Sequence, residues 1–222
     1  MRPQALSVLV PGISRKFMNS VLLSRLCQKH VTCIGDHAHP WCLDTDLLQL
    51  ATQMPRLESL FVSLEFDCEW MFSSAFPNSL RCLSINMYQK PVEFINLIVL
   101  AVPQLHVLEE LYMASCHNGH NNGLNLQPLS SMVALKKLSF RGIVITCEEN
   151  IALLRSMRHS ETLCVQMNDA SWAELVKPGH SLFQLQEINR PGFLSSQRNM
   201  DLLANLPSLT KVVTPEMECS HM

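Results

Sequence analysis

One leucine-based phrase recurs along this chain at a nearly constant spacing. Its clearest copies span 57–60, 80–83, 108–111 and 135–138, each beginning and ending in leucine, and looser copies follow at 160–163, 185–188 and 209–212. Successive copies begin 23, 28, 27, 25, 25 and 24 residues apart. A period in the twenties is typical of solenoids, whose repeats bury their apolar sides against one another. The spacing therefore predicts a repeat protein, a class that usually offers an extended surface to another macromolecule.

Each copy continues into a pattern that predicts a short strand and then a helix. After Leu57, the apolar Leu60 and Val62 alternate with Ser59, Phe61 and Ser63. This period of two is typical of a strand with one buried face. Between strands the apolar spacing changes to about 3.6 residues, which indicates helices. We expect helices after Asp44, Pro91 and Ser196, and capping boxes at 146–149 and 171–174 ahead of two more. Each unit thus comprises strand, turn and helix in about 25 residues.

The L-x-x-L-x-L core of these units carries a family resemblance. It is well matched from Leu57, Leu80, Leu108 and Leu135, and the chain resembles leucine-rich repeat proteins of the long, helix-bearing kind, similar to the ribonuclease-inhibitor and F-box-associated subfamilies. Variable repeat length and a weak ninth position are closer to the irregular F-box-associated repeats. The resemblance implies an α/β fold: a right-handed solenoid, or horseshoe, with a parallel β-sheet on the concave face and helices on the convex face.

The resemblance also divides the chain into three parts. Residues 28–214 form the leucine-rich repeat domain, with about seven irregular repeats. Residues 1–27 are expected to hold a capping helix with the apolar stripe Phe17, Val21, Leu22 and Leu26. The alternative is the remnant of an F-box, the helical module that docks on a cullin-ligase adaptor. Residues 215–222 form a C-terminal tail.

Composition limits the classes of partner and compartment. The net charge is −2 and only 16% of residues are charged, so no basic stripe for nucleic acid is present. Nine irregularly spaced cysteines do not fit a small disulfide scaffold, and the longest apolar segment, 94–102, is far too short for a membrane span. We therefore expect an intracellular protein, cytoplasmic or nuclear, that binds neither nucleic acid nor membrane.

Two clusters could carry chemistry. Cys33, His37, His39 and Cys42 are zinc-competent, but their spacing departs from the common paired pattern. Cys33 also fits an inward strand position beside Val31, so a structural loop is the favoured interpretation. In the second cluster, Cys116 beside a histidine could suggest a nucleophile, yet it also fits the turn after a strand. We predict no enzyme, no cofactor and no metal.

The sequence predicts instead a non-enzymatic module that binds a partner protein through its concave face. Phe61 and Tyr112 are the expected hot spots, because aromatic side chains dominate binding energy when they are desolvated. Cys82 is expected to point outward in the same face. The predicted binding residues are Ser59, Phe61, Ser84, Asn86, Glu110, Tyr112, Lys137, Ser139, Arg141 and Gln166.

Three functional interpretations stay open. The specific version of the first is the substrate-recognition part of an F-box-type ubiquitin ligase, with a cullin-ligase adaptor as a further partner; it rests on the resemblance alone. The second is a metal-binding or cysteine-dependent protein that uses the Cys33–Cys42 or Cys116 region. The third is an inactive fragment of a larger repeat protein.

Overall fold

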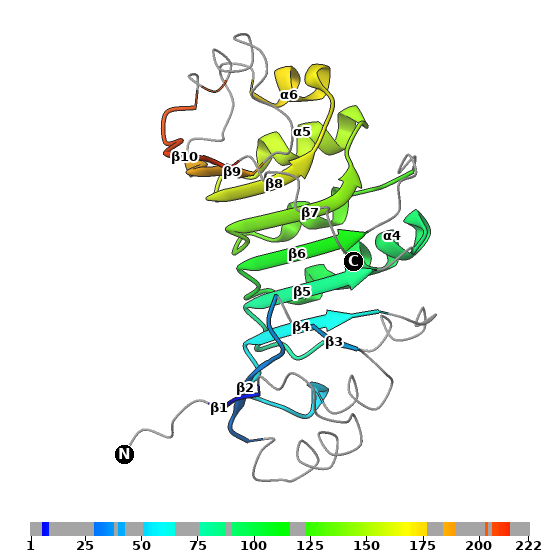
Figure 1. The fold of residues 1–222 in the computed structure, drawn as a ribbon, viewed down its shortest axis with the longest axis vertical. Coiled ribbons are helices and arrows are strands. Elements are labelled where there is room, and N and C mark those ends of the chain that lie inside the picture. Colours follow the sequence, from blue (N-terminus) through cyan, green and yellow to red (C-terminus); the bar gives the residue numbers. More distant parts are fainter. Residues whose placement is uncertain are drawn as a thin grey trace, which may run out of the picture.

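The computed structural model of this chain describes residues 6–8, 29–37, 40–42, 51–64, 76–87, 90–115, 123–176, 184–189, 203 and 206–213. These residues build one ten-stranded sheet in the order β1-β2-β4-β5-β6-β7-β8-β9-β10, and β3 also pairs with β4 (Figure 1). The strands are β1 (Leu6–Val8), β2 (Val31–Ile34), β3 (Trp41–Cys42), β4 (Ser59–Ser63), β5 (Cys82–Met87), β6 (Glu110–Ser115), β7 (Lys137–Val144), β8 (Thr162–Gln166), β9 (Glu187–Asn189) and β10 (Lys211–Val213).

Every strand pair is parallel, and the repeats stack in register. From β4 onward, each strand pairs with the strand of the next repeat, so the chain is a solenoid of α/β units. The last residue of the repeated phrase lies in one continuous row across the sheet: Leu60, Leu83, Leu111, Leu138, Leu163, Ile188 and Val212. The spacing of the phrase therefore predicted the strand register correctly, including the looser copies.

Backbone hydrogen bonds repeat with the same period at the start of each strand. The carbonyl of Glu58 accepts the N–H groups of Arg81 and Cys82, at 2.8 and 2.9 Å. The carbonyls of Arg81, Glu109, Lys136, Glu161 and Gln186 do the same toward the following repeat. Because each carbonyl accepts two N–H groups of the following repeat, this ladder holds neighbouring repeats at a constant spacing.

The repeat extends further upstream than the phrase found in the sequence. Three residues before the phrase lies a further apolar position, occupied by Met54, Leu105, Met132, Met157 and Leu206. Its carbonyl accepts the N–H of the first residue of the phrase at 3.0–3.2 Å in these five repeats. Apolar side chains therefore line the turn that leads into each strand, and all but Met157, which is partly buried, belong to the buried core.

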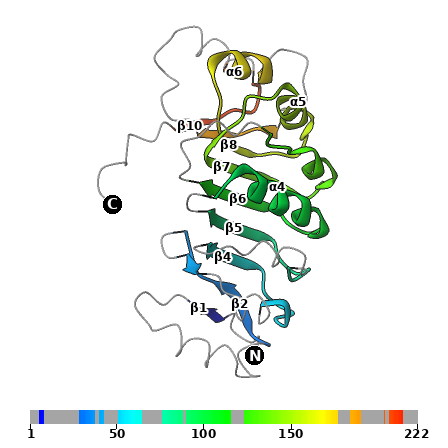
Figure 2. The ribbon, with the colours of Figure 1, turned by 90° about the vertical axis from the view of Figure 1, so that its right-hand side faces the viewer.

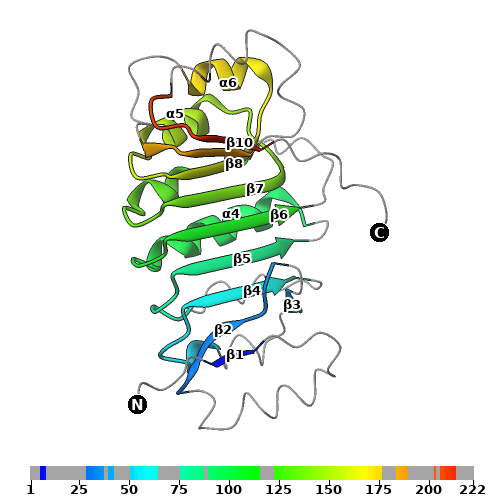
Figure 3. The same ribbon diagram turned by 60° about the vertical axis from the view of Figure 1, so that its left-hand side comes forward.

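Helices lie on one side of the sheet. Helices α4 (Val92–Ala101) and α5 (Glu148–Ser156) are behind it in Figure 3, and α6 (Asp169–Leu175) contacts α5 (Figure 2). Two 3₁₀ turns, η2 (Val102–Gln104), which directly follows α4, and η3 (Gln127–Ser131), occupy equivalent positions ahead of β6 and β7. We use the term open face for the sheet surface opposite α4 and α5. No helix among the described residues is long and apolar enough to cross a membrane.

Both predicted capping boxes are wrong. Helix α5 begins at Glu148, with Cys147 as its N-cap and no side-chain cap bond, so Thr146 lies one residue too early. Helix α6 begins at Asp169, and the Asn168 side chain caps it by accepting the N–H of Ser171 at 2.8 Å. Asparagine is among the best N-cap residues, and it precedes the predicted serine cap by three positions. Pro91 does introduce α4, as its N-cap.

Two asparagines hold the segment that precedes η3. The Asn96 amide of α4 donates to Gly123 O at 2.8 Å and accepts the N–H of Asn125 at 2.9 Å. From the next helix, Asn150 donates to Leu124 O at 2.8 Å and accepts the N–H of Leu126 at 2.9 Å. Each side-chain amide thus supplies the donor and the acceptor that a neighbouring strand would otherwise offer to the backbone of this segment.

Several predictions lie outside the described residues. They include the helical stripe from Phe17 to Leu26, most of the helix after Asp44, the Cys116 loop, the helix cap at Ser196 and the C-terminal tail. Residues 6–8 form β1, which pairs with β2 and adds a strand at that edge of the sheet.

Candidate protein-binding face

The first described repeat contains an interrupted strand. Cys33 and Ile34 of β2 pair with Ser59 and Leu60, and Trp41 of β3 then pairs with Val62 of the same strand. Residues 35–40 therefore lie opposite Phe61 alone. Gly35, with φ of 74°, begins this segment in a conformation that favours glycine. The surplus residues that the structure describes, 35–37 and 40, leave the line of the strand as a loop, which we call the 35–40 loop.

This loop folds over the open face. The His37 imidazole lies 4.7 Å from the Phe61 ring and 4.6 Å from the Tyr112 ring, with both interplanar angles at 80°. These are edge-to-face contacts of the kind that aromatic rings prefer. The two predicted hot-spot residues are thus brought together, and His37 of the same chain lies between them. The sequence predicted His37 as a loop residue or metal ligand, and gave no indication of this contact.

A second irregularity lies in β7. Phe140 pairs with Val165 of β8, but the next pair is Val144 with Gln166, so residues 141–143 form a bulge. Gly142 has φ of 70°, and a Cβ atom there would lie 1.7 Å from the Ser115 carbonyl oxygen. Only glycine fits this position. Bulges re-aim neighbouring side chains, and this one carries the exposed Arg141.

A groove of about 540 Å³ lies on the open face and is lined by residues of both irregularities. Of the predicted binding residues, it is lined by Ser84, Asn86, Tyr112, Lys137, Ser139 and Arg141. Ser59, Phe61, Glu110 and Gln166 do not line it, although their strand positions place them on the same face. His37 and Pro40 from the loop form one wall, and Cys164 and Glu187 line the part toward β9. Although it lines the groove, the Ser139 residue is only 6% exposed.

Most charges at the groove are neutralised within the chain. Lys137 Nζ lies 2.7 Å from Glu110 Oε1, and the Tyr112 hydroxyl donates to Glu110 Oε2 at 2.9 Å. Burial and this hydrogen bond raise the pKa of Tyr112, so its hydroxyl stays protonated. Glu187 pairs with Lys211 at 2.9 Å. Among the described residues, Arg141 has no ion pair.

Two thiols on the open face, Cys33 and Cys82, are poorly suited to nucleophilic chemistry. Cys33 is not inward as predicted: it lies in register with Ser59 and Cys82, while Val31 and Ile34 are buried. Cys82 lies on the open face as expected, in register with Ser59 and Glu110, but its neighbours cover it and it is only 9% exposed. Burial, with the neighbouring Glu110, raises the pKa of the Cys82 thiol to about 12, and burial also raises the pKa of Cys33. Protonated thiols are weak nucleophiles and weak metal ligands.

The proposed zinc ligands are not assembled in the described part of the chain. His37 contacts two aromatic rings, and no group of three or more His, Cys, Asp or Glu side chains within the described ranges could hold a metal ion. His39, the Cys42 side chain and Cys116 lie outside those ranges.

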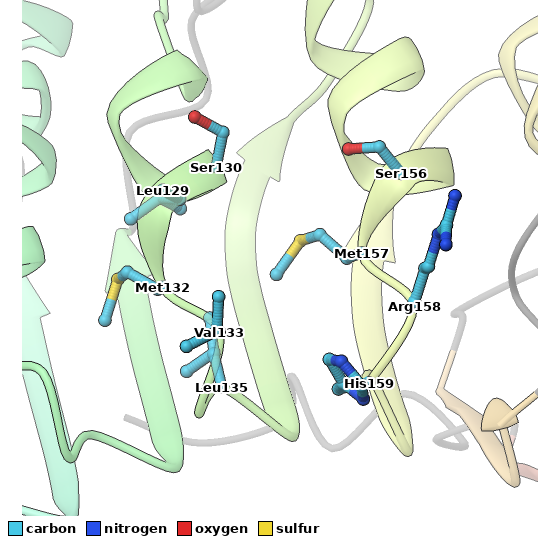
Figure 4. A pocket seen from close by; sticks show the side chains of 9 residues that line it. All are labelled: Leu129, Ser130, Met132, Val133, Leu135, Ser156, Met157, Arg158 and His159. Atoms are coloured by element: carbon cyan, nitrogen blue, oxygen red, sulfur yellow. The ribbon is translucent and has the colours of Figure 1, made fainter.

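A smaller hollow of about 190 Å³ lies away from the open face, between the turns that precede β7 and β8. Met132 and Val133 come from one repeat and Met157 from the next, with Arg158 and His159 at the rim (Figure 4). Val133 is 76% exposed. The hollow has room for one side chain, whereas the groove spans five strands.

No family model and no curated protein match the chain. Among solved structures, the chain is similar to an internalin C2 from Listeria monocytogenes, with a TM-score of 0.46 and 13% identity, covering 96% of this chain and 77% of that chain. Values this low transfer neither a fold nor a ligand, so the repeat architecture rests on the register and hydrogen bonds described above.

Proposed function

We propose that this chain is a non-enzymatic leucine-rich repeat protein that binds a partner protein through its open face. The observation that carries the proposal is the groove that runs from the 35–40 loop across the β7 bulge to β9. Both irregularities interrupt the strand register, and residues of both line the same groove. Irregular strand segments held on a rigid scaffold are where binding function concentrates.

A more specific version of this proposal adds that the solenoid is right-handed, that its open face is concave and that the protein is intracellular. What supports the compartment is the set of free thiols at Cys33, Cys82, Cys147 and Cys164. In that version the protein is the substrate-recognition part of an F-box-type ubiquitin ligase, a role supported only by the irregular repeat lengths. Recovery of a cullin-ligase adaptor with the purified chain would support the role, and its absence from a lysate that contains the adaptor would count against it.

The binding proposal is tested by comparing two arginine substitutions. Ser84→Arg places a long charged side chain in the groove, whereas Ala152→Arg places the same side chain on the exposed surface of α5. Proteins retained from a cell lysate by each variant and by the wild type are quantified by mass spectrometry. We expect one set of proteins to be lost with Ser84→Arg and kept with Ala152→Arg. Identical sets from all three chains would contradict the proposal.

A further inference from the structure

We propose that the groove recognises an acidic side chain, aspartate or glutamate, in an extended segment of the partner protein, and that Arg141 is its cationic contact. This inference rests on the proposed function and specifies the chemistry of the partner. It follows from the charges at the groove, from the shape of its floor and from the position of the β7 bulge.

The charges leave one guanidinium without a counter-ion. Lys137 pairs with Glu110, and Glu187 pairs with Lys211, so these four groups cancel within the chain. Arg141 lines the same groove, is exposed, and has no ion pair within the described residues. A carboxylate is the group that a planar guanidinium binds best, because two parallel N–H···O bonds can form. A ligand that brings one negative charge would therefore complete the charge balance of the groove.

The floor beside Arg141 is shaped to admit such a group. Asn86, Ala114 and Arg141 form one row across β5, β6 and β7. Neighbouring strands are about 4.8 Å apart, so the two polar residues are about 10 Å apart with only a methyl group between them. A larger residue in place of Ala114 would fill this gap. The small residue thus leaves space for an acidic side chain to reach Arg141 over the sheet.

Asn86 offers a second contact at the other end of the row. Its Oδ1 atom is buried and has no hydrogen-bond partner. Turning the amide so that this oxygen faces the groove would break no bond of that atom, and would let it accept a backbone N–H of the ligand. An N–H group and a carboxylate a few ångströms apart are what an acidic residue in an extended peptide presents.

The β7 bulge accounts for the availability of Arg141. Strand β7 pairs with β6 as far as Arg141 and then leaves the register with β8 until Val144. Gly142 lies against the Ser115 carbonyl, which fixes the backbone next to Arg141. The Arg141 side chain therefore lines the groove from β7, between the strands that carry Tyr112 and Cys164.

The experiment is selection from a phage library of random twelve-residue peptides fused through their C-termini, so that no free terminal carboxylate is displayed. Peptides selected on the wild-type chain should carry aspartate or glutamate at one common position. The best peptide is then synthesised with an amidated C-terminus, beside a version with the amide analogue of its acidic residue. Arg141→Gln should weaken binding about tenfold or more, and the amide peptide should bind Arg141→Gln as well as the acidic one does.

The control is Arg158→Gln, because Arg158 is an exposed arginine outside the groove and also has no ion pair among the described residues. It removes the same charge and should leave the affinity unchanged. Equal weakening by Arg158→Gln would overturn the inference by showing a bulk charge effect. Selected peptides without a common acidic position would overturn the inference and leave the proposed function standing. Failure of the wild-type chain to select any peptide would count against both.

Discussion

His37 attaches the 35–40 loop to the sheet through its contacts with Phe61 and Tyr112. Partial burial of the ring lowers the pKa of His37, and the charge of Arg141 lowers it further, while Glu110 and Asp36 act in the opposite direction. The neutral imidazole is therefore the form that the folded chain favours. At pH values below the ordinary pKa of histidine, protonation of His37 is therefore opposed by the partial burial of its ring between the two aromatic side chains.

The first prediction concerns the titration of this histidine. We expect an NMR titration of His37 to give a midpoint below the ordinary value of about 6.5. Because protonation is favoured in the unfolded chain, the contribution of His37 to stability is complete above about pH 6.5. It is lost as the pH falls from there to the folded value. Arg141→Gln removes a positive neighbour and should raise the midpoint. A midpoint at or above the ordinary value would contradict this account of the loop.

Ser160 occupies a position that leucine fills in most other repeats. The equivalent residues are Leu57, Leu80, Leu108, Leu135, Leu185 and Leu209. Ser160 is 2% exposed, and its hydroxyl oxygen has no hydrogen-bond partner. A buried hydroxyl without a partner costs about 1–3 kcal/mol of stability. The serine therefore weakens the repeat that contains β8.

The second prediction follows from that cost. Ser160→Ala should increase the free energy of unfolding by about 1 kcal/mol, which raises the melting temperature by about 2–4 °C in a chain of this size. The control is Ser156→Ala, because the Ser156 hydroxyl donates to Leu153 O at 2.7 Å and its loss should not stabilise the chain. Thermal unfolding followed by circular dichroism measures both. A lower melting temperature for Ser160→Ala would contradict the prediction.

At the scale of elements, the β7 bulge depends on one glycine. Gly142→Ala would place a Cβ atom within 1.7 Å of the Ser115 carbonyl oxygen, at a positive φ of 70°. Gly123 provides the matched comparison, since its φ is 93° but nothing lies within 4 Å of the Cβ position. Gly123→Ala should cost only the backbone strain of about 1–2 kcal/mol. Gly142→Ala should cost clearly more, because β6 and β7 must also move apart. Equal losses in urea unfolding would show that the contact with Ser115 is unimportant.

The asparagine clamps give a second comparison between elements. Asn150→Ala leaves the buried Leu124 carbonyl and Leu126 N–H without partners, so we expect a loss of about 2–4 kcal/mol. Asn96→Ala removes the equivalent pair of bonds at a more exposed site, where water can replace them. Its cost should be about 1 kcal/mol or less. Equal costs would mean that burial of the clamp does not determine its contribution.

The register of the strands could be predicted from the sequence, whereas the buried face of β2 and the helix starts could not. Strand register followed from the phrase, because one leucine per repeat must lie in the same buried row. In β2, strand alternation predicted the wrong face for Cys33. Val31 and Ile34 are both buried, and Cys33 lies in register with Ser59 on the open face. The helix starts at 148 and 169 were missed because several residues could cap each helix, and the choice depends on the preceding turn.

At the scale of the whole molecule, the open face could be predicted but the groove could not. Lys137, Tyr112 and Arg141 were placed on one surface by strand alternation alone. The shape of the groove depends on two departures from the repeat: the 35–40 loop and the bulge at 141–143. Surplus residues carry no periodicity, so the sequence gives their number but not the direction in which they leave the strand. His37 was missed for this reason.

The whole molecule thus combines a regular scaffold with a local site. The carbonyl ladder and the buried leucine row set the spacing of the repeats, and the two irregularities then form a hollow on the face that α4 and α5 leave uncovered (Figure 3). The account predicts that a partner contacts this face between β5 and β9 and leaves the helices free.

The measurement that tests this claim most directly is site-specific photo-crosslinking in a cell lysate. The photoreactive residue p-benzoylphenylalanine is introduced at Ser84 in the groove, or at Ala152 on α5, one position per chain. We predict a discrete crosslinked product from position 84 that is absent from position 152 and is lost in the presence of excess unlabelled wild-type chain. A competable product from position 152, with none from position 84, would contradict the account by placing the partner on the helices.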